Sequence, residues 1–335
     1  MQTMELLPEE SSKLAIAITK TGHLKVEHPL LLECGDVLQN VKIRYTTAGK
    51  LNKTKTNVVW VFHALTANSN PIEWWPGLVG DGFVINPKDH FIICANMLGS
   101  CYGTTGPLNA QFPLVTIKDM VTLHQILIQH LGITKIHLGI GGSMGGQQLL
   151  EWAVQEPNLF DHIVPLAANA FHSPWAIAFN EAQRMALENI DPSKGLEAAR
   201  AIALLSYRHY DTYQSTQEDL DQRWDGFKAS SYQRYQGEKL RKRFSVNSYY
   251  TLSKAMDSHH IGRNFGSAEA ALKRIKSKAL VIGIDTDILF PYHEQEFIAK
   301  HIKGGKFVKI KSNYGHDGFL TESDKITLLL KDFLK

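Results

Sequence analysis

The hexapeptide Gly141-Gly142-Ser143-Met144-Gly145-Gly146 decides the fold of this 335-residue chain. The apolar run 136–140 before it predicts a strand, and the stretch 147–153 after it predicts a helix. Small residues around a serine at such a junction indicate a tight turn that exposes the serine hydroxyl. A structural turn or an anion site would also fit this pattern, but no Lys-Ser/Thr pair follows the glycines, which excludes a P-loop. We therefore predict Ser143 as a nucleophile and the Met144 amide as an oxyanion donor.

A nucleophilic serine needs a base and a carboxylate that orients the base, and the chain supplies both in later segments. The apolar run 279–284 ends at Asp285 and Asp287, and the run 306–310 leads into a Gly-His-Asp-Gly turn that contains His316. The order Ser, Asp, His is that of the α/β-hydrolase fold, so we predict His316 as the base. Asp287 is the favoured acid because it lies deeper in its loop, and Asp285 is expected to bond the loop backbone. The residues alone leave both aspartates open.

A second oxyanion donor is expected from a loop that follows an early strand. The run Asn57–Phe62 predicts such a strand, and His63-Ala64-Leu65-Thr66 follows it directly. The Leu65 amide is the candidate donor, although position alone does not distinguish it from its neighbours.

Alternating strand-like and helix-like segments indicate the architecture. The pattern predicts an α/β fold with a largely parallel, doubly wound sheet. From residue 173 to 265 strand signals vanish and helical spacings recur, which predicts a helical lid inserted before the strand that carries the acid. We expect residues 1–172 and 266–335 to form the α/β-hydrolase core domain and 173–265 to form the lid. The predicted strands are 42–45, 58–62, 91–95, 135–140, 163–167, 279–284 and 307–310.

Composition fits one large enzyme domain. The chain is 44% apolar, and its net charge of +3 is too small to indicate nucleic-acid binding; the basic run 239–243 is expected to be a solvated helix face. Three cysteines, Cys34, Cys94 and Cys101, show no metal-ligand spacing and indicate a reducing compartment. With no apolar run of membrane-spanning length and no signal-peptide pattern, we expect a cytoplasmic protein that does not enter a membrane.

Seven segments stand in a characteristic order along the chain: 63–66, 74–75, 94–107, 141–146, 150–153, 180–184 and 314–317. Together they resemble the homoserine O-acetyltransferase family of α/β-hydrolase acyltransferases, and the likeness runs from about Leu31 to the C-terminus. This pattern is much more specific than the serine turn alone, which many hydrolases share.

The resemblance implies an acceptor site. Arg200 and Tyr207 match the residues that hold the substrate α-carboxylate, and Asp317 matches the residue that holds its amino group. Spacing shows only that Arg200 and Tyr207 share a helical face, and a guanidinium suits a carboxylate because it can bond both oxygens. On the residues alone, a surface ion pair is the favoured role of Arg200, and Asp317 could cap a helix.

The resemblance also implies the reaction. An acetyl group would pass from acetyl-CoA, a co-substrate, through acyl-Ser143 to the hydroxyl of L-homoserine in methionine biosynthesis, without a metal or bound cofactor. A homodimer built through the lid is implied as well, and the basic run 239–243 could attract coenzyme A phosphates. Ala67 replaces the family's usual glycine and the region 184–256 is short, so succinyl-CoA as donor and L-serine as acceptor stay open. The residues also allow an esterase, a thioesterase or a non-catalytic binding protein.

Overall fold

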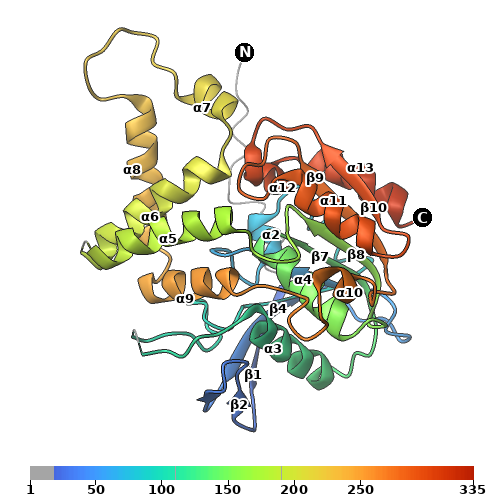
Figure 1. The fold of residues 1–335 in the computed structure, drawn as a ribbon. Helices are drawn as coiled ribbons and strands as arrows, with labels where there is room; N and C mark the ends of the chain where they lie inside the picture. The colour runs from blue at the N-terminus through green and yellow to red at the C-terminus, as the bar shows by residue number, and fades with distance from the viewer. Residues whose placement is uncertain (1–18, 110, 190) are drawn as a thin grey trace.

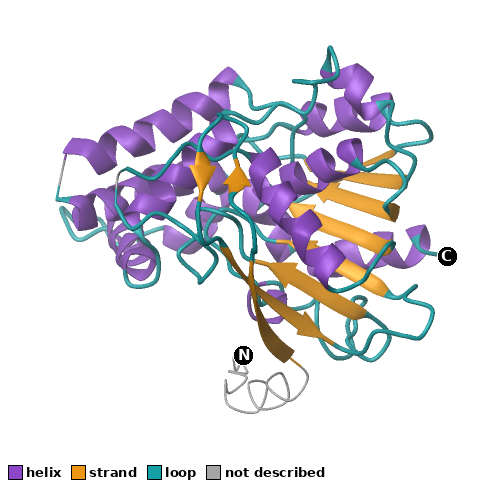
Figure 2. Ribbon diagram, turned by 90° about the horizontal axis from the view of Figure 1, so that it is seen from below, coloured by secondary structure: helices purple, strands orange, loops and turns teal. Residues whose placement is uncertain are grey.

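The computed structural model describes residues 19–109, 111–189 and 191–335, and its centre is an eight-stranded sheet (Figures 1 and 2). The strand order is β1-β4-β6-β5-β7-β8-β9-β10; β1 and β6 pair antiparallel with β4, and the other pairs are parallel. This confirms the predicted α/β fold. The strands are β1 (Thr19–Lys25), β4 (Lys42–Ala48), β5 (Val58–Phe62), β6 (Phe91–Ala95), β7 (Ile136–Gly142), β8 (Phe160–Leu166), β9 (Lys278–Ile284) and β10 (Lys306–Ile310), and a separate hairpin pairs β2 (Leu30–Leu31) with β3 (Val37–Leu38).

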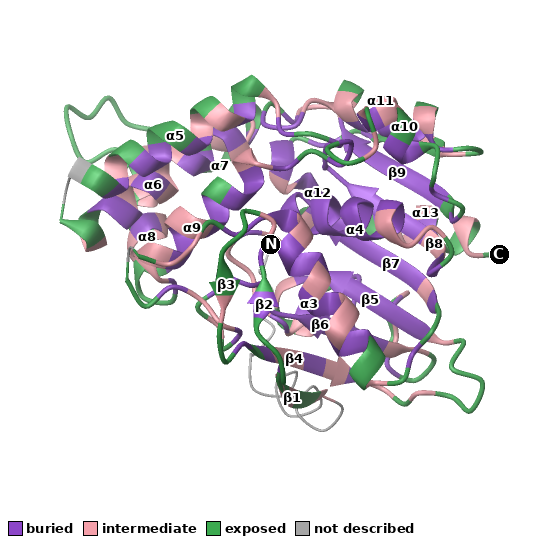
Figure 3. Cartoon of the chain, turned by 60° about the horizontal axis from the view of Figure 1, so that its bottom comes forward, coloured by how far each residue is buried: buried purple, intermediate pink, exposed green. Residues whose placement is uncertain are grey.

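Two hydrophobic cores cover the two faces of the sheet, whose central strands are buried along their length (Figure 3). One core contains the aromatic rings of Trp60 and Trp152, which meet edge to face with centroids 4.9 Å apart. The other contains Trp75 and Phe319, also edge to face at 6.2 Å. The first core is closed by α3 (Ile117–His130), α4 (Met144–Gln155), α10 (Ala268–Leu272) and α11 (Tyr292–His301), and the second by α2 (Pro71–Trp74), α12 (Gly318–Thr321) and α13 (Ser323–Phe333).

Five of the six helices described between β8 and β9 lie to one side of the sheet, in the segment predicted as a lid (Figure 1). They are α5 (Pro174–Asn189), α6 (Pro192–Tyr207), α7 (Tyr210–Gln217), α8 (Lys228–Arg241) and α9 (Val246–Asp257). Helix α6 packs between α5 and α8, while the segment 218–227 after α7 projects away from the body (Figure 1). None of the helices in the described part of the chain is long and apolar enough to cross a membrane.

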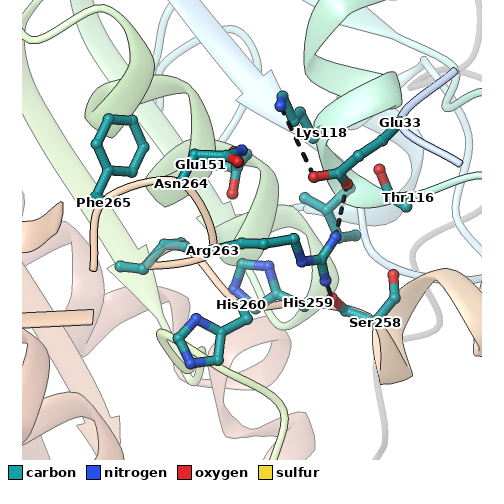
Figure 4. A pocket seen from close by; sticks show the side chains of 12 residues that line it. Glu33, Thr116, Lys118, Glu151, Ser258, His259, His260, Arg263, Asn264 and Phe265 are labelled. Atoms are coloured by element: carbon teal, nitrogen blue, oxygen red, sulfur yellow. Dashed lines mark hydrogen bonds and ion pairs between the residues drawn. The ribbon is translucent and has the colours of Figure 1, made fainter. Parts of the chain in front are cut away.

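An ionic cluster fastens the β2–β3 hairpin to the segment that follows α9 (Figure 4). The Glu33 carboxylate accepts a hydrogen bond from Arg263 at 2.7 Å and lies 3.7 Å from the Lys118 ammonium. Glu151 of α4 borders the same small pocket and is buried, and this burial raises the pKa of Glu151 to about 7. Glu151 therefore keeps its proton to a higher pH than an exposed glutamate does, beside the ion pair of Glu33 and Arg263.

Candidate active site

Ser143 occupies the turn between β7 and α4 in a strained backbone conformation, with φ 55° and ψ −128°. Its amide donates to the Leu166 carbonyl of β8 at 2.9 Å. A Cβ at Gly145 would lie 2.2 Å from the Phe62 carbonyl oxygen, so α4 can start this close to β5 only with glycine there. The flanking small residues thus let the turn present Ser143 above the ends of the parallel strands.

A continuous chain of hydrogen bonds joins Ser143, His316 and Asp287. The Ser143 Oγ lies 2.8 Å from His316 Nε2, and His316 Nδ1 lies 2.6 Å from Asp287 Oδ2. The second oxygen of Asp287 accepts the amides of Leu289 and Phe290, each at 2.9 Å. The structure thus brings together the three residues predicted as nucleophile, base and acid, and can move a proton from serine to imidazole.

Asp285 lies on the same loop but points elsewhere. Its Oδ1 accepts the Ser312 amide at 2.9 Å, which ties the end of β9 to the segment after β10. This is the backbone role expected for Asp285, and it leaves Asp287 as the carboxylate in contact with the imidazole.

The surroundings of His316 favour a protonated imidazole. Burial opposes the charge, but the carboxylates of Asp287, Asp317 and Glu294 outweigh burial and raise the pKa of His316 above its ordinary value. The bond to Asp287 fixes the hydrogen on Nδ1, so Nε2 of the neutral ring faces Ser143 as an acceptor.

Leu65 lies in the loop after β5 and is buried. His63 holds the loop: its Nε2 accepts the Met97 amide at 3.2 Å, and burial lowers the pKa of His63 to about 4, which keeps the ring neutral. Gln148 donates to the carbonyls of His63 and Met144 at 3.3 and 3.1 Å. One side chain therefore links the loop that carries Leu65 to the turn that carries Met144.

The three residues assigned to the acceptor lie at one side of His316. Arg200 and Tyr207 come from α6, with the Arg200 guanidinium carbon 5.6 Å from the centre of the Tyr207 ring, and the Tyr207 ring lies 5.7 Å from the imidazole. Asp317 follows His316 directly, and its carboxylate pairs with Arg208 at 2.8 Å instead of capping α12. Burial raises the pKa of the Tyr207 phenol, so its hydroxyl is a neutral donor at physiological pH.

Sequence reasoning missed Arg208, Glu294 and Arg243. Arg208 is adjacent to Tyr207, but its partner Asp317 is distant in sequence, so no local pattern reveals the pair. Glu294 begins α11, and burial raises its pKa to about 7 close to Asp287 and His316. The basic run 239–243 is only partly a solvated face, because Arg241 pairs with Glu197 and Arg243 donates to the Thr66 carbonyl.

Comparison with known proteins assigns this arrangement to a family. The family model described as the alpha/beta hydrolase fold matches residues 57–323. The homoserine O-acetyltransferase of Cyclobacterium marinum is 47% identical over 326 residues, which cover 92% of this chain and 93% of that protein. The homoserine O-acetyltransferase of Trichormus variabilis is 42% identical, with 94% and 93% covered.

Solved structures agree with this assignment. The homoserine O-acetyltransferase of Staphylococcus aureus superposes with a TM-score of 0.84 at 30% identity and covers 95% of each chain. Esterase E22 superposes with a TM-score of 0.86 over 95% of this chain and 100% of its own, but at 20% identity it shows the fold alone. The chain therefore belongs to the homoserine O-acetyltransferase family within the α/β-hydrolase fold.

Proposed function

We propose that the protein transfers the acetyl group of acetyl-CoA to the hydroxyl of L-homoserine, as a step of methionine biosynthesis. The observation that carries this proposal is the Ser143–His316–Asp287 hydrogen-bond chain beside Arg200, Tyr207 and Asp317, in a member of this family. A nucleophile with an adjacent set of charged side chains suits an acceptor that carries both an ammonium and a carboxylate.

The first half-reaction acylates the serine. Ser143 Oγ attacks the thioester carbonyl of acetyl-CoA while His316 Nε2 takes its proton. The amides of Leu65 and Met144 donate to the oxyanion of the tetrahedral intermediate. When the intermediate collapses, the sulfur of coenzyme A leaves with the proton from His316, and acetyl-Ser143 remains.

The second half-reaction transfers the acetyl group from Ser143 to homoserine. Arg200 and Tyr207 bind the carboxylate of homoserine, Asp317 binds its ammonium, and His316 takes the proton of its hydroxyl as that oxygen attacks the acetyl carbonyl. O-acetylhomoserine leaves as Ser143 recovers its proton from His316. Orientation of this kind contributes roughly 7–11 kcal/mol, which lets a bound hydroxyl outcompete water. The steps use no metal ion and no bound cofactor.

Coenzyme A release tests the proposal. Purified protein is assayed with acetyl-CoA and with succinyl-CoA, each without an acceptor, with L-homoserine and with L-serine, and Ser143→Ala is the blank. We expect release that requires both acetyl-CoA and homoserine. Preference for succinyl-CoA or for serine would reassign donor or acceptor, and release indifferent to amino acids would indicate a thioesterase and overturn the acceptor site.

We also propose that two copies associate through the helices between β8 and β9. Leu220 and Trp224 are 92% and 98% exposed in the projecting segment after α7, and Tyr210 and Tyr235 are exposed beside it. Exposed aromatic side chains on a protruding segment suit an interface between subunits. Sedimentation should give twice the 37.6 kDa chain mass, and Trp224→Ser should shift the protein toward the monomer.

The compartment is part of the same proposal. Cys34, Cys94 and Cys101 are all unpaired, which suits the reducing cytoplasm. Fractionation of cells that express the protein from its own gene should recover it with cytoplasmic enzymes.

A further inference from the structure

The end of α6 is fastened to the loop that carries His316. A Cβ at Gly315, whose φ is +62°, would lie 2.9 Å from the Tyr207 carbonyl oxygen, so the two backbones are in direct contact. The Thr212 hydroxyl donates to the Asn313 carbonyl, and the Tyr207 ring faces the imidazole. Residues 207–212 therefore contact the loop 313–317 at several points, in addition to the bond from the Gly315 amide to the Thr286 hydroxyl.

Arg208 makes the charged contact of this junction. Its Nε lies 2.8 Å from Oδ2 of Asp317, and the two side chains are only 25% and 15% exposed. The backbone of Arg208 is fixed as well, because its amide donates to the Leu204 carbonyl at 3.0 Å. The contact is an ion pair without the geometry of a hydrogen bond, and among the described residues Oδ1 of Asp317 has no charged partner of its own, so the attraction of Arg208 acts on one side of the carboxylate.

The far side of Arg208 faces open space rather than a second carboxylate. It borders a cavity of about 180 Å³ whose other lining residues are Thr212, Tyr213, Thr216, Gln217, Tyr232 and Tyr314. Burial raises the pKa of Tyr213, and its hydroxyl has no partner among the described residues. A cavity of this size has room for water beside the guanidinium, and hydration lowers the cost of holding a charge there.

We propose that Arg208 is a positioning residue for the acceptor: it holds Oδ2 of Asp317 so that Oδ1 meets the acceptor ammonium. This inference rests on the proposed function. Restricting a carboxylate to one orientation before substrate arrives lowers the cost of ordering it on binding. The Arg208 guanidinium also repels the acceptor ammonium, and this repulsion weakens binding of the acceptor. Removing the guanidinium therefore raises KM for homoserine if positioning dominates and lowers it if repulsion dominates.

The test compares Arg208→Gln with the wild type, Arg208→Lys and Arg241→Gln. Arg241 is the matched control, because it is also an arginine paired with a carboxylate, Glu197 at 2.6 Å, but on the exposed end of α8. Three quantities are measured: the rate of Ser143 acetylation by acetyl-CoA, KM and kcat for L-homoserine, and the ratio of kcat/KM for homoserine to that for 4-hydroxybutanoate. The last compound is homoserine without its amino group and cannot use Asp317.

We expect Arg208→Gln to acetylate Ser143 at the wild-type rate, to raise KM for homoserine roughly tenfold, and to reduce the homoserine to 4-hydroxybutanoate ratio by a similar factor. Arg208→Lys should restore part of the ratio, and Arg241→Gln should leave it unchanged. Asp317→Asn should reduce the ratio as well, and the double variant with Arg208→Gln should lose little more than Asp317→Asn alone.

Three results would overturn the inference while leaving the proposed function standing. The first is a ratio in Arg208→Gln equal to that of Arg241→Gln, and the second is a fall in KM for homoserine, which would show that repulsion dominates. Slow acetylation of Ser143 in Arg208→Gln would also count against it, since that result means general damage to the loop of His316. A wild type that shows no homoserine-dependent turnover would remove the proposed function, and this inference with it.

Discussion

Both carboxylate oxygens of Asp287 make hydrogen bonds, whereas Asp285, two residues earlier, accepts a hydrogen bond from a backbone amide. Asp287 holds the imidazole through Oδ2 and is held through Oδ1 by the Leu289 and Phe290 amides. We expect Asp287→Asn to lower kcat on the order of 10⁴-fold, because an amide stabilises the wrong tautomer of His316 and cannot balance its charge. Steady-state kinetics with acetyl-CoA and homoserine measure this loss. Asp285→Asn is the matched control: its amide oxygen can still accept the Ser312 amide, and a comparable loss there would contradict the assignment.

Because of Glu151, the free energy of unfolding falls as pH rises from about 4.5 to about 7. Its pKa rises from 4.5 to about 7 on folding, so the native state holds this proton more tightly than the unfolded state. The stabilisation is complete below about pH 4.5 and is lost as pH rises to about 7. Glu151→Gln should therefore raise the free energy of unfolding by up to about 3 kcal/mol at pH 8 and by only about 2 kcal/mol at pH 6, above the range of acid unfolding. Urea unfolding at both pH values measures the difference, and equal effects at the two would refute it.

At the scale of elements, the loop after β5 is held from the lid side by one arginine. Arg243, just after α8, donates to the Thr66 carbonyl at 2.5 Å and to the Tyr102 hydroxyl at 2.9 Å. Because Leu65 precedes Thr66, we expect Arg243→Gln to slow both half-reactions by roughly threefold to thirtyfold through a displaced oxyanion donor. Stopped-flow acetylation and single-turnover deacylation report the two rates. Lys242→Gln, which removes a surface pair with Glu238, should change neither, and an effect confined to one half-reaction would exclude this explanation.

Some elements and contacts can be predicted from the sequence, and others cannot. The unit formed by β7, the turn at Ser143 and α4 is predictable because its signals, an apolar run, small residues and a helical pattern, are local. Strand β1 escapes prediction because its residues are polar or half-buried and make no apolar alternation; pairing with β4 creates it. The Arg208–Asp317 contact escapes for a related reason, since the packing of α6 on the loop of His316 brings together residues that no pattern connects.

At the scale of the whole molecule, four buried histidines make the fold sensitive to acid. Burial lowers the pKa of His63 and His124 to about 4 and that of His172 and His259 to about 3. These groups stabilise the native state fully above pH 6.5, and the stabilisation is lost as pH falls toward 3–4. Glu151 and Glu294 act in the opposite sense, so these six groups together contribute a loss of about 3 kcal/mol per pH unit at the steepest point.

We therefore expect cooperative acid unfolding between about pH 6 and 4, followed by far-ultraviolet circular dichroism. His124→Gln removes one of the four buried rings and should move the midpoint to lower pH, while the same change at the exposed His28 should not. A midpoint that both variants leave unchanged would show that other groups control the transition.

At Ser143, the residue that gives the most stable backbone differs from the residue that the reaction requires. A φ of 55° suits glycine better than serine, so replacement by glycine would relieve on the order of 1 kcal/mol of strain while removing the nucleophile. Only selection for catalytic activity opposes this gain in stability. In a lineage that no longer needs the reaction, we expect glycine at this position to be an early inactivating substitution. The fold would remain stable without the activity.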